Sequence, residues 1–286
     1  MSKSDVISIG HSPDPDDAFM VWAIAEGVVH ADDFGTALVA KDIESLNRWA
    51  LADDPRTRLD VTALSAATYA RVADKYWLLR HGASFGDGYG PIVVSAKPVA
   101  SLADLKDVTI FTPGENTTAH MVLQLALPGA RVAKKSFEKI LPAIQKGEAE
   151  AGVLIHEGQL TWADAGVHKV LDLGAWWKEE TGLPLPLGVN TMRKDLGARL
   201  GADVDALLRA SLETGLAMRK RALAYAQRFG RGISDEDADA FVAMYVNGMT
   251  RDMGETGKRA LDELFARARA AGLLPKGARI EYAPED

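Results

Sequence analysis

The sequence contains no cysteine, and this absence excludes several kinds of chemistry. A chain without cysteine has no disulfide framework, no thiolate ligand for a metal and no thiol nucleophile. No apolar run approaches the ~20 residues that a membrane-spanning helix needs. The N-terminus enters a strand pattern directly and lacks the apolar segment and cleavage site of a secretory signal. We therefore expect a cytoplasmic protein that has no membrane partner.

The sequence also lacks an excess of positive charge. Its 33 Lys and Arg residues are outnumbered by 40 Asp and Glu residues, which gives a formal net charge of -7. This balance argues against nucleic acid or an anionic membrane surface as a partner. There is no low-complexity tract, and no period indicates a solenoid. With 286 residues, 47% of them hydrophobic, the chain can build one large domain or two ordinary ones.

The segment Ala151–Gln159 is the most informative stretch of the sequence. It has the pattern of a short buried strand that runs into His156 and then a glycine. Ligands of open α/β sheets sit beyond the carboxyl ends of strands, where a histidine can move a proton near neutral pH. A structural histidine that bonds backbone groups at a loop start is the alternative. This segment alone does not decide between the two.

Small polar side chains stand at the carboxyl ends of three expected strands in the first third of the chain. Each of these strands is followed by a helical pattern, which is the order of a parallel sheet with a ligand crevice. The strands are Val6–Gly10, Thr36–Lys41 and Val61–Ser65, and the side chains are Ser12, Asp42 and Ser65.

The loop after the first strand has two interpretations. Asp14 suits the N-cap of the following helix, Pro15 its first position, and Asp16 and Asp17 its first turn. If Asp14 only caps the helix, Asp14→Asn is nearly silent for stability, because asparagine caps equally well. The loop is also a candidate ligand-binding segment, because it places Ser12 and three acids at a strand-to-helix turn. Asp42 is likewise a plausible N-cap of the next helix.

Four glycines, at positions 82, 86, 88 and 90, precede an expected strand at Pro91–Ser95. They are not a dinucleotide fingerprint, since a strand follows where a helix should, and they indicate a hinge. Leu185–Thr191 is likewise bounded by proline and glycine, and it is the strand by which we expect the chain to return to the first domain. The two crossings predict a discontinuous α/β domain, 1–92 plus 190–286, around an inserted α/β domain, 93–189. This is the two-lobed architecture of type 2 periplasmic binding proteins, with the ligand between the lobes.

The inserted domain adds one more candidate binding segment. Thr117 and Thr118 open a helical run and offer hydroxyl groups and free N–H groups to a carboxylate or phosphate, although a plain threonine N-cap explains them equally well. Phe137–Lys146 reads as a helix that Pro142 could divide into two short pieces. The adjacent Trp176 and Trp177 favour packing over ligand stacking. The convergence of polar groups on one cleft favours the functional interpretation of His156.

Several motifs together resemble a known family over nearly the whole chain. They occur in the order and spacing of 1,4-dihydroxy-6-naphthoate synthase, an enzyme of the futalosine route to menaquinone. The motifs are Ser12-Pro-Asp-Pro-Asp-Asp17, Asp42-Ile-Glu-Ser-Leu-Asn47, Gly86-Asp-Gly-Tyr-Gly-Pro91, Thr117-Thr118-Ala119, Ile155-His-Glu157, Leu173-Gly-Ala-Trp-Trp177 with Gly182-Leu-Pro-Leu-Pro-Leu-Gly188, and Tyr245–Asn247.

The resemblance implies a cytoplasmic lyase with a binding-protein fold that cleaves cyclic dehypoxanthine futalosine without a metal or organic cofactor. Its small, carboxylated substrate would be the only partner implied, and a homodimer is left open. The family's base carries over onto His156, and its carboxylate-binding positions carry over onto Ser65, Thr117 and Thr118. Ser12 and Asp42 would lie near the sugar-derived ring.

The sequence departs from the family's pattern in the first loop. The family commonly reads Ser-Pro-Cys-Pro-Asn-Asp there, whereas this chain has Asp14 and Asp16, which we count among the candidate substrate-binding residues. Two further interpretations stay open: a non-catalytic binding protein for a small carboxylated or aromatic ligand, and an enzyme like chorismate dehydratase. The missing export signal argues against a transport receptor.

Overall fold

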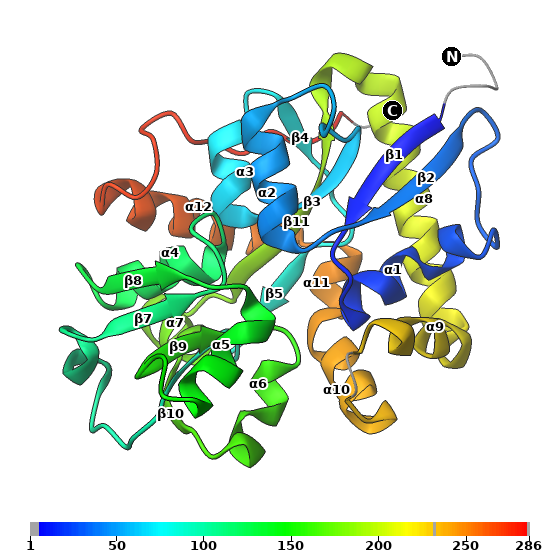
Figure 1. Cartoon of the computed structure of the whole chain (residues 1–286). Helices are drawn as coiled ribbons and strands as arrows, with labels where there is room; N and C mark the ends of the chain where they lie inside the picture. Colours follow the sequence, from blue (N-terminus) through cyan, green and yellow to red (C-terminus); the bar gives the residue numbers. More distant parts are fainter. Residues whose placement is uncertain (1–5, 231–232, 285–286) are drawn as a thin grey trace.

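Two β-sheets, each flanked by helices, build the protein (Figure 1). The structure is a computed structural model that describes residues 6–230 and 233–284. Residues 1–5, from which we expected no secretory signal, lie outside the described residues. Alternating strands and helices confirm the predicted α/β class.

The first sheet has six strands within the described residues, in the order β2-β1-β3-β11-β4, with β5 beside β11. β1 runs parallel to β2 and β3, and β11 runs antiparallel to β3, β4 and β5. The strands are β1 (Val6–His11), β2 (Gly35–Ala40), β3 (Val61–Ser65), β4 (Tyr76–Leu78), β5 (Ser84–Gly86) and β11 (Leu185–Arg193).

The second sheet has five strands in the described chain, in the order β10-β6-β9-β7-β8. β7 is parallel to β8 and β9, while β6 is antiparallel to β9 and β10. The strands are β6 (Ile92–Ser95), β7 (Thr109–Thr112), β8 (Arg131–Lys134), β9 (Ala151–Leu154) and β10 (His168–Asp172). The carboxyl ends of β1 and β3 in one sheet, and of β7 and β9 in the other, carry the polar segments singled out in the sequence.

The helices cover both sheets, and α1, α8, α9 and α10 pack together beside the first sheet (Figure 1). The longer helices are α1 (Pro15–Ala25), α2 (Ile43–Ala52), α3 (Ala66–Val72), α4 (Thr118–Ala126), α5 (Phe137–Gln145), α7 (Leu173–Thr181), α8 (Ala198–Ala217), α9 (Arg219–Ala226), α10 (Asp235–Tyr245) and α12 (Gly254–Ala270). Two single turns are α6 (Gly158–Thr161) and α11 (Gly248–Arg251). Short 3-10 turns occupy Leu102–Leu105, Trp162–Ala165, Lys194–Leu196 and Gln227–Phe229.

The chain passes between the sheets twice. It leaves the first sheet after β5 and enters β6, and it returns between α7 and β11. The division at 92/93 and 189/190 stays a prediction. The pairing of β11 with β5 from Leu185 onward favours a second boundary a few residues before 190.

The glycine-rich crossing is fixed by a close backbone contact. The carbonyl group of Tyr89 lies against both Gly86 and Gly174, so a Cβ atom at either glycine would collide with it. At Gly174 such a Cβ would also lie 2.6 Å from the backbone nitrogen of Gly90. Glycine is therefore required here because two backbone segments approach each other closely.

Pro142 lies inside the continuous helix α5, so the expected division of this helix into two short pieces is wrong. The buried side chains of Ile140 and Ile144 pack with residues of the second sheet, and this packing holds the helix together although the proline removes one backbone hydrogen bond.

Trp177 is fully buried in the core, and its indole N–H donates to the Pro184 carbonyl at 3.2 Å, as the packing interpretation predicts.

Candidate functional site

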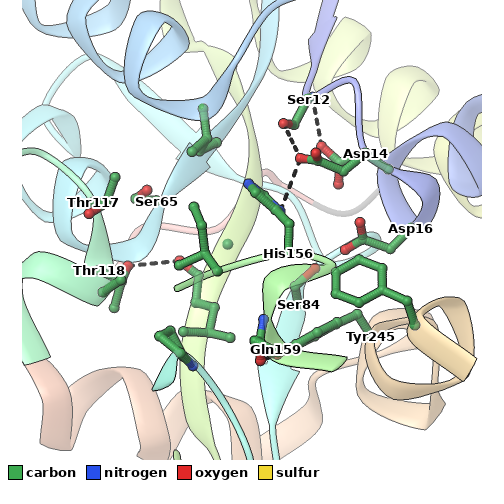
Figure 2. A pocket seen from close by; sticks show the side chains of 18 residues that line it. Ser12, Asp14, Asp16, Ser65, Ser84, Thr117, Thr118, His156, Gln159 and Tyr245 are labelled. Carbon is green, nitrogen blue, oxygen red and sulfur yellow. Dashed lines mark hydrogen bonds and ion pairs between the residues drawn. The ribbon is translucent and has the colours of Figure 1, made fainter. Parts of the chain in front are cut away.

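A cavity with about 640 Å³ of empty space, its open mouth included, lies between segments of the two sheets. Its polar lining comes from the ends of strands and the starts of helices, as the sequence predicts. Figure 2 shows Ser65, Thr117 and Thr118 on one side of the cavity and Ser12, Asp14 and Asp16 on the other, with His156 between them. The described lining residues are Ser12, Asp14, Asp16, Asp17, Ile43, Ser65, Ser84, Pro91, Thr117, Thr118, Ala119, Ile155, His156, Gln159, Leu187, Gly188, Phe241 and Tyr245.

His156 is held in an unusual backbone conformation directly after β9. Its φ angle is 53°, in the left-handed region that side-chain-bearing residues seldom adopt. This conformation ends the strand and turns the chain into α6. The side chain is 16% exposed, and its Nε2 atom is buried and has no hydrogen-bond partner. A histidine whose outer nitrogen lines a cavity without a protein partner is available to a ligand, which disfavours the purely structural interpretation.

The other ring nitrogen of His156 faces an acid from the first sheet. Nδ1 lies 3.2 Å from Oδ2 of Asp14, a side chain that is only 1% exposed. The Ser12 hydroxyl donates to the same carboxylate oxygen. The ring of Phe137 packs edge-on against the imidazole, with centroids 4.8 Å apart. The imidazole is thus fixed by contacts on two sides.

The capping interpretation of the Asp14 side chain is wrong. Asp14 does stand at the N-cap of α1, where its carbonyl accepts from the Ala18 N–H at 2.9 Å, but its side chain makes no capping hydrogen bond. The carboxylate is instead occupied by His156 and Ser12. Pro15 takes the first helical position, as predicted.

Asp16 and Asp17 form the acidic side of the cavity. Burial, together with the neighbouring charges of Asp17 and Asp14, raises the pKa of Asp16 well above its ordinary value. Burial and the charge of Asp14 raise the pKa of Asp17 to about 7, although Asp17 accepts the Ser12 N–H at 2.7 Å. The cluster therefore holds protons at pH values where exposed aspartates are ionised.

We expect this cluster to make the protein less stable as the pH rises. The folded state keeps a proton on Asp17 up to about pH 7, whereas an unfolded aspartate loses it near pH 4, so the unfolding free energy falls between these values. Asp17→Asn should flatten this decline, which for one group cannot exceed about 1.4 kcal/mol per pH unit. Urea unfolding from pH 4 to 7 measures it. The exposed Asp32→Asn variant is the control, and parallel profiles for wild type and Asp17→Asn would contradict the prediction.

The opposite side of the cavity offers hydrogen-bond donors. Ser65 accepts from the Asn47 amide at 2.9 Å, which leaves its own hydroxyl proton for a ligand. The Thr117 hydroxyl accepts from the His120 N–H and donates to the Gly114 carbonyl, so the cap interpretation is right for this side chain. The Thr118 hydroxyl donates to the Leu187 carbonyl at 2.8 Å and accepts the Ala67 N–H. The N–H groups of Thr118 and Ala119, which begin α4 and lack acceptors within the helix, are the remaining donors.

Asp42 does not line the cavity. Its carboxylate accepts the backbone N–H of Ser45 at 3.0 Å and the Ser45 hydroxyl at 2.7 Å, and so caps α2. The N-cap interpretation of Asp42 is confirmed. A substrate contact from this residue would require its carboxylate to leave the helix end, where it stabilises free N–H groups.

The lining includes four residues that were not predicted as site residues, although two of them, Gln159 and Tyr245, lie in segments quoted above; the other two are Ser84 and Phe241. Tyr245 comes from α10 and lies with its hydroxyl 2.6 Å from the side-chain amide of Gln159 in α6, across the cavity (Figure 2). Burial raises the pKa of Tyr245 above its usual range. The signal for Gln159 was its position three residues after His156, and its backbone N–H donates to the His156 carbonyl at 3.1 Å in the turn that leads into α6. Spacing gave no signal for Ser84 or Phe241, and Tyr245 was marked only by the family resemblance.

Two negative observations apply to the described part of the chain. Across residues 6–230 and 233–284, no group of three or more His, Asp or Glu side chains could hold a metal ion. None of the helices that the structure describes is both long enough and apolar enough to span a membrane.

Comparison with known proteins identifies the family. Residues 7–270 match a family model described as menaquinone biosynthesis. The chain belongs to the menaquinone biosynthesis family. A Thermus thermophilus relative named 1,4-dihydroxy-6-naphthoate synthase is 41% identical over 275 residues, covering 96% of this chain and 98% of its own. A Streptomyces coelicolor relative of the same name is 35% identical over 283 residues, with 96% of both chains covered. Membership of this family makes the chain an enzyme of menaquinone biosynthesis, as the motifs predicted.

Solved structures confirm the fold of this menaquinone biosynthesis protein. A crystal structure of an Archaeoglobus fulgidus protein superposes with a TM-score of 0.88 at 40% identity and covers 94% of this chain and 98% of its own. The periplasmic aliphatic sulphonate binding protein from Escherichia coli superposes with a TM-score of 0.68 at 14% identity, covering 99% of this chain and 94% of its own. The predicted periplasmic-binding-protein-like architecture is therefore confirmed.

Proposed function

We propose that this enzyme is a cytoplasmic lyase that converts cyclic dehypoxanthine futalosine to 1,4-dihydroxy-6-naphthoate, with His156 as its general base. The observation that carries the proposal is the buried, unpartnered Nε2 atom of His156 on the cavity wall. A neutral imidazole nitrogen in this position can accept a substrate proton near neutral pH. The electron pair left on the substrate then drives cleavage of a carbon–carbon bond, and the imidazolium can return the proton.

The two sides of the cavity orient the substrate in this proposal. The substrate carboxylate lies at the start of α4, where it accepts the first-turn N–H groups and the Ser65 hydroxyl proton. Among the described lining residues none is lysine or arginine, so neutral donors and the helix dipole hold the charge. The polyol part of the substrate then faces Ser12 and Asp16, where a protonated carboxyl can donate as well as accept.

The direct test is turnover by the purified protein, with product followed by chromatography. We expect 1,4-dihydroxy-6-naphthoate to form from cyclic dehypoxanthine futalosine, and no product to form from chorismate, the control substrate. Binding of the substrate without product would contradict the lyase and indicate a binding protein of the same fold. Conversion of chorismate alone would identify a dehydratase.

A further inference from the structure

We propose that Asp14 is the positioning residue of His156: its carboxylate fixes the imidazole with the proton on Nδ1 and directs the Nε2 lone pair at the ligand. This inference rests on the proposed role of His156 as a general base. It assigns to the Asp14 side chain a task in the reaction that the N-cap position of this residue does not predict.

The hydrogen-bonding capacities of the two side chains determine the tautomer. A neutral imidazole has one donor nitrogen and one acceptor nitrogen, whereas an ionised carboxylate only accepts. Because Nδ1 lies 3.2 Å from Oδ2 of Asp14, Nδ1 must carry the proton. Nε2 is then the acceptor, and it is the buried ring atom on the cavity side that has no protein partner. The opposite tautomer would set two lone pairs against each other at Asp14 and leave no acceptor for a substrate proton.

The surroundings hold the carboxylate in place. Asp14 is 1% exposed and receives the Ser12 hydroxyl, while the backbone N–H of Ser12 is held by Asp17 at 2.7 Å. The Phe137 ring limits rotation of the imidazole from the other side. Because its neighbours hold the Asp14 carboxylate in one place, this carboxylate can fix the orientation of the imidazole, as a positioning residue must.

The two partners come from different sheets. Asp14 follows β1 of the first sheet, and His156 follows β9 of the second, so their contact spans the cavity (Figure 2). The Tyr245–Gln159 contact spans it a second time. Asp14 can therefore fix the tautomer of His156 only while the two walls of the cavity are in the contact that this structure shows.

The wild-type protein tests the inference without any substrate. A long-range ¹H–¹⁵N spectrum at neutral pH distinguishes the two tautomers of each histidine, and the His156 signals are those missing from the His156→Asn variant. We expect the proton on Nδ1 of His156. A proton on Nε2 would overturn the proposal, whether or not the protein turns over substrate.

Asp14→Asn gives the kinetic test. Its amide can donate to Nδ1 and so favours the wrong tautomer, and we expect kcat to fall at least about 10²-fold with KM within about threefold. The other ionisable groups in the lining are Asp16, Asp17 and Tyr245. These groups are unchanged in the variant.

A double variant separates positioning from a general structural role. If Asp14 acts through His156, Asp14→Asn added to His156→Asn costs little further activity, because residues that act as one unit are not additive. The exposed Asp32→Asn is the matched control and should retain wild-type kinetics. The inference is refuted if the two losses of activity multiply in the double variant. It is also refuted if the kcat of Asp14→Asn lies within threefold of the wild-type value. Absence of wild-type turnover would refute the proposed function instead, and the tautomer spectrum would still decide the position of the proton.

Discussion

His156→Asn is expected to lower kcat for cyclic dehypoxanthine futalosine by roughly 10²- to 10⁴-fold, the usual contribution of a general base. The variant loses the unpartnered Nε2 atom that faces the cavity. Asparagine is the appropriate replacement because it tolerates the left-handed conformation that His156 adopts with φ 53°. Its amide can also donate to the buried Asp14 carboxylate, which alanine would leave without this partner. The loss should therefore reflect chemistry and not folding.

The measurement is steady-state turnover of wild type and variant beside His168→Asn, a substitution at an exposed histidine in β10. Thermal unfolding of all three proteins controls for the fold. We expect His168→Asn to match wild type and His156→Asn to keep its unfolding temperature within a few degrees. A His156→Asn enzyme that turns over at the wild-type rate would dismiss His156 as the base, even if the lyase reaction itself is confirmed.

Gly174→Ala is expected to destabilise the protein by about 3–5 kcal/mol, at the upper end for a single substitution. The added methyl group would collide with the carbonyl of Tyr89, and this neighbour is backbone that cannot rotate away. Relief requires a shift of either the start of α7 or the crossing between β5 and β6. Overpacking of this kind costs more than the gain in helix propensity when alanine replaces glycine, which is at most about 1 kcal/mol.

Thermal unfolding measures this effect with a matched control. Gly248 stands at the start of α11, and a Cβ there would meet no atom within 4 Å. For a chain of this size the expected loss lowers Tm by roughly 8–15 °C, while Gly248→Ala should change Tm by no more than about 2 °C. Equal unfolding temperatures of the two variants would show that the crossing adapts easily, contrary to the close contact described above.

Local sequence rules predicted those parts of the site that local geometry determines. His156, Ser65 and the threonines of α4 were found because strands end and helices begin at these residues, and ligands gather there. The N-cap of Asp42 followed from the same rules. Strands such as β5, with three residues, are too short to show a period, and β11 and α10 reach the cavity only through tertiary packing.

Asp14 shows where such rules stop. Its position before Pro15 correctly marked the start of α1, yet its side chain turns away from the helix toward an imidazole from the other sheet. Burial supplies the reason, since a carboxylate that is 1% exposed is stabilised by a donor ring and a hydroxyl. The choice between a capping bond and a contact across the cavity depends on the assembled sheets, which no window of the sequence contains.

The acidic lining also affects how a ligand reaches the cavity. Three aspartates and no lysine or arginine are found among the described residues that line it, in a chain whose formal net charge is -7. Protons on Asp16 and Asp17 reduce the charge of the lining itself, but the negative charge of the whole chain repels an anion at long range, and the anion is attracted only on contact with the N–H and hydroxyl groups inside. Dissolved salt weakens the long-range part far more than the contacts. The encounter rate of an anionic ligand should then rise with ionic strength, the reverse of the behaviour of electrostatically steered enzymes.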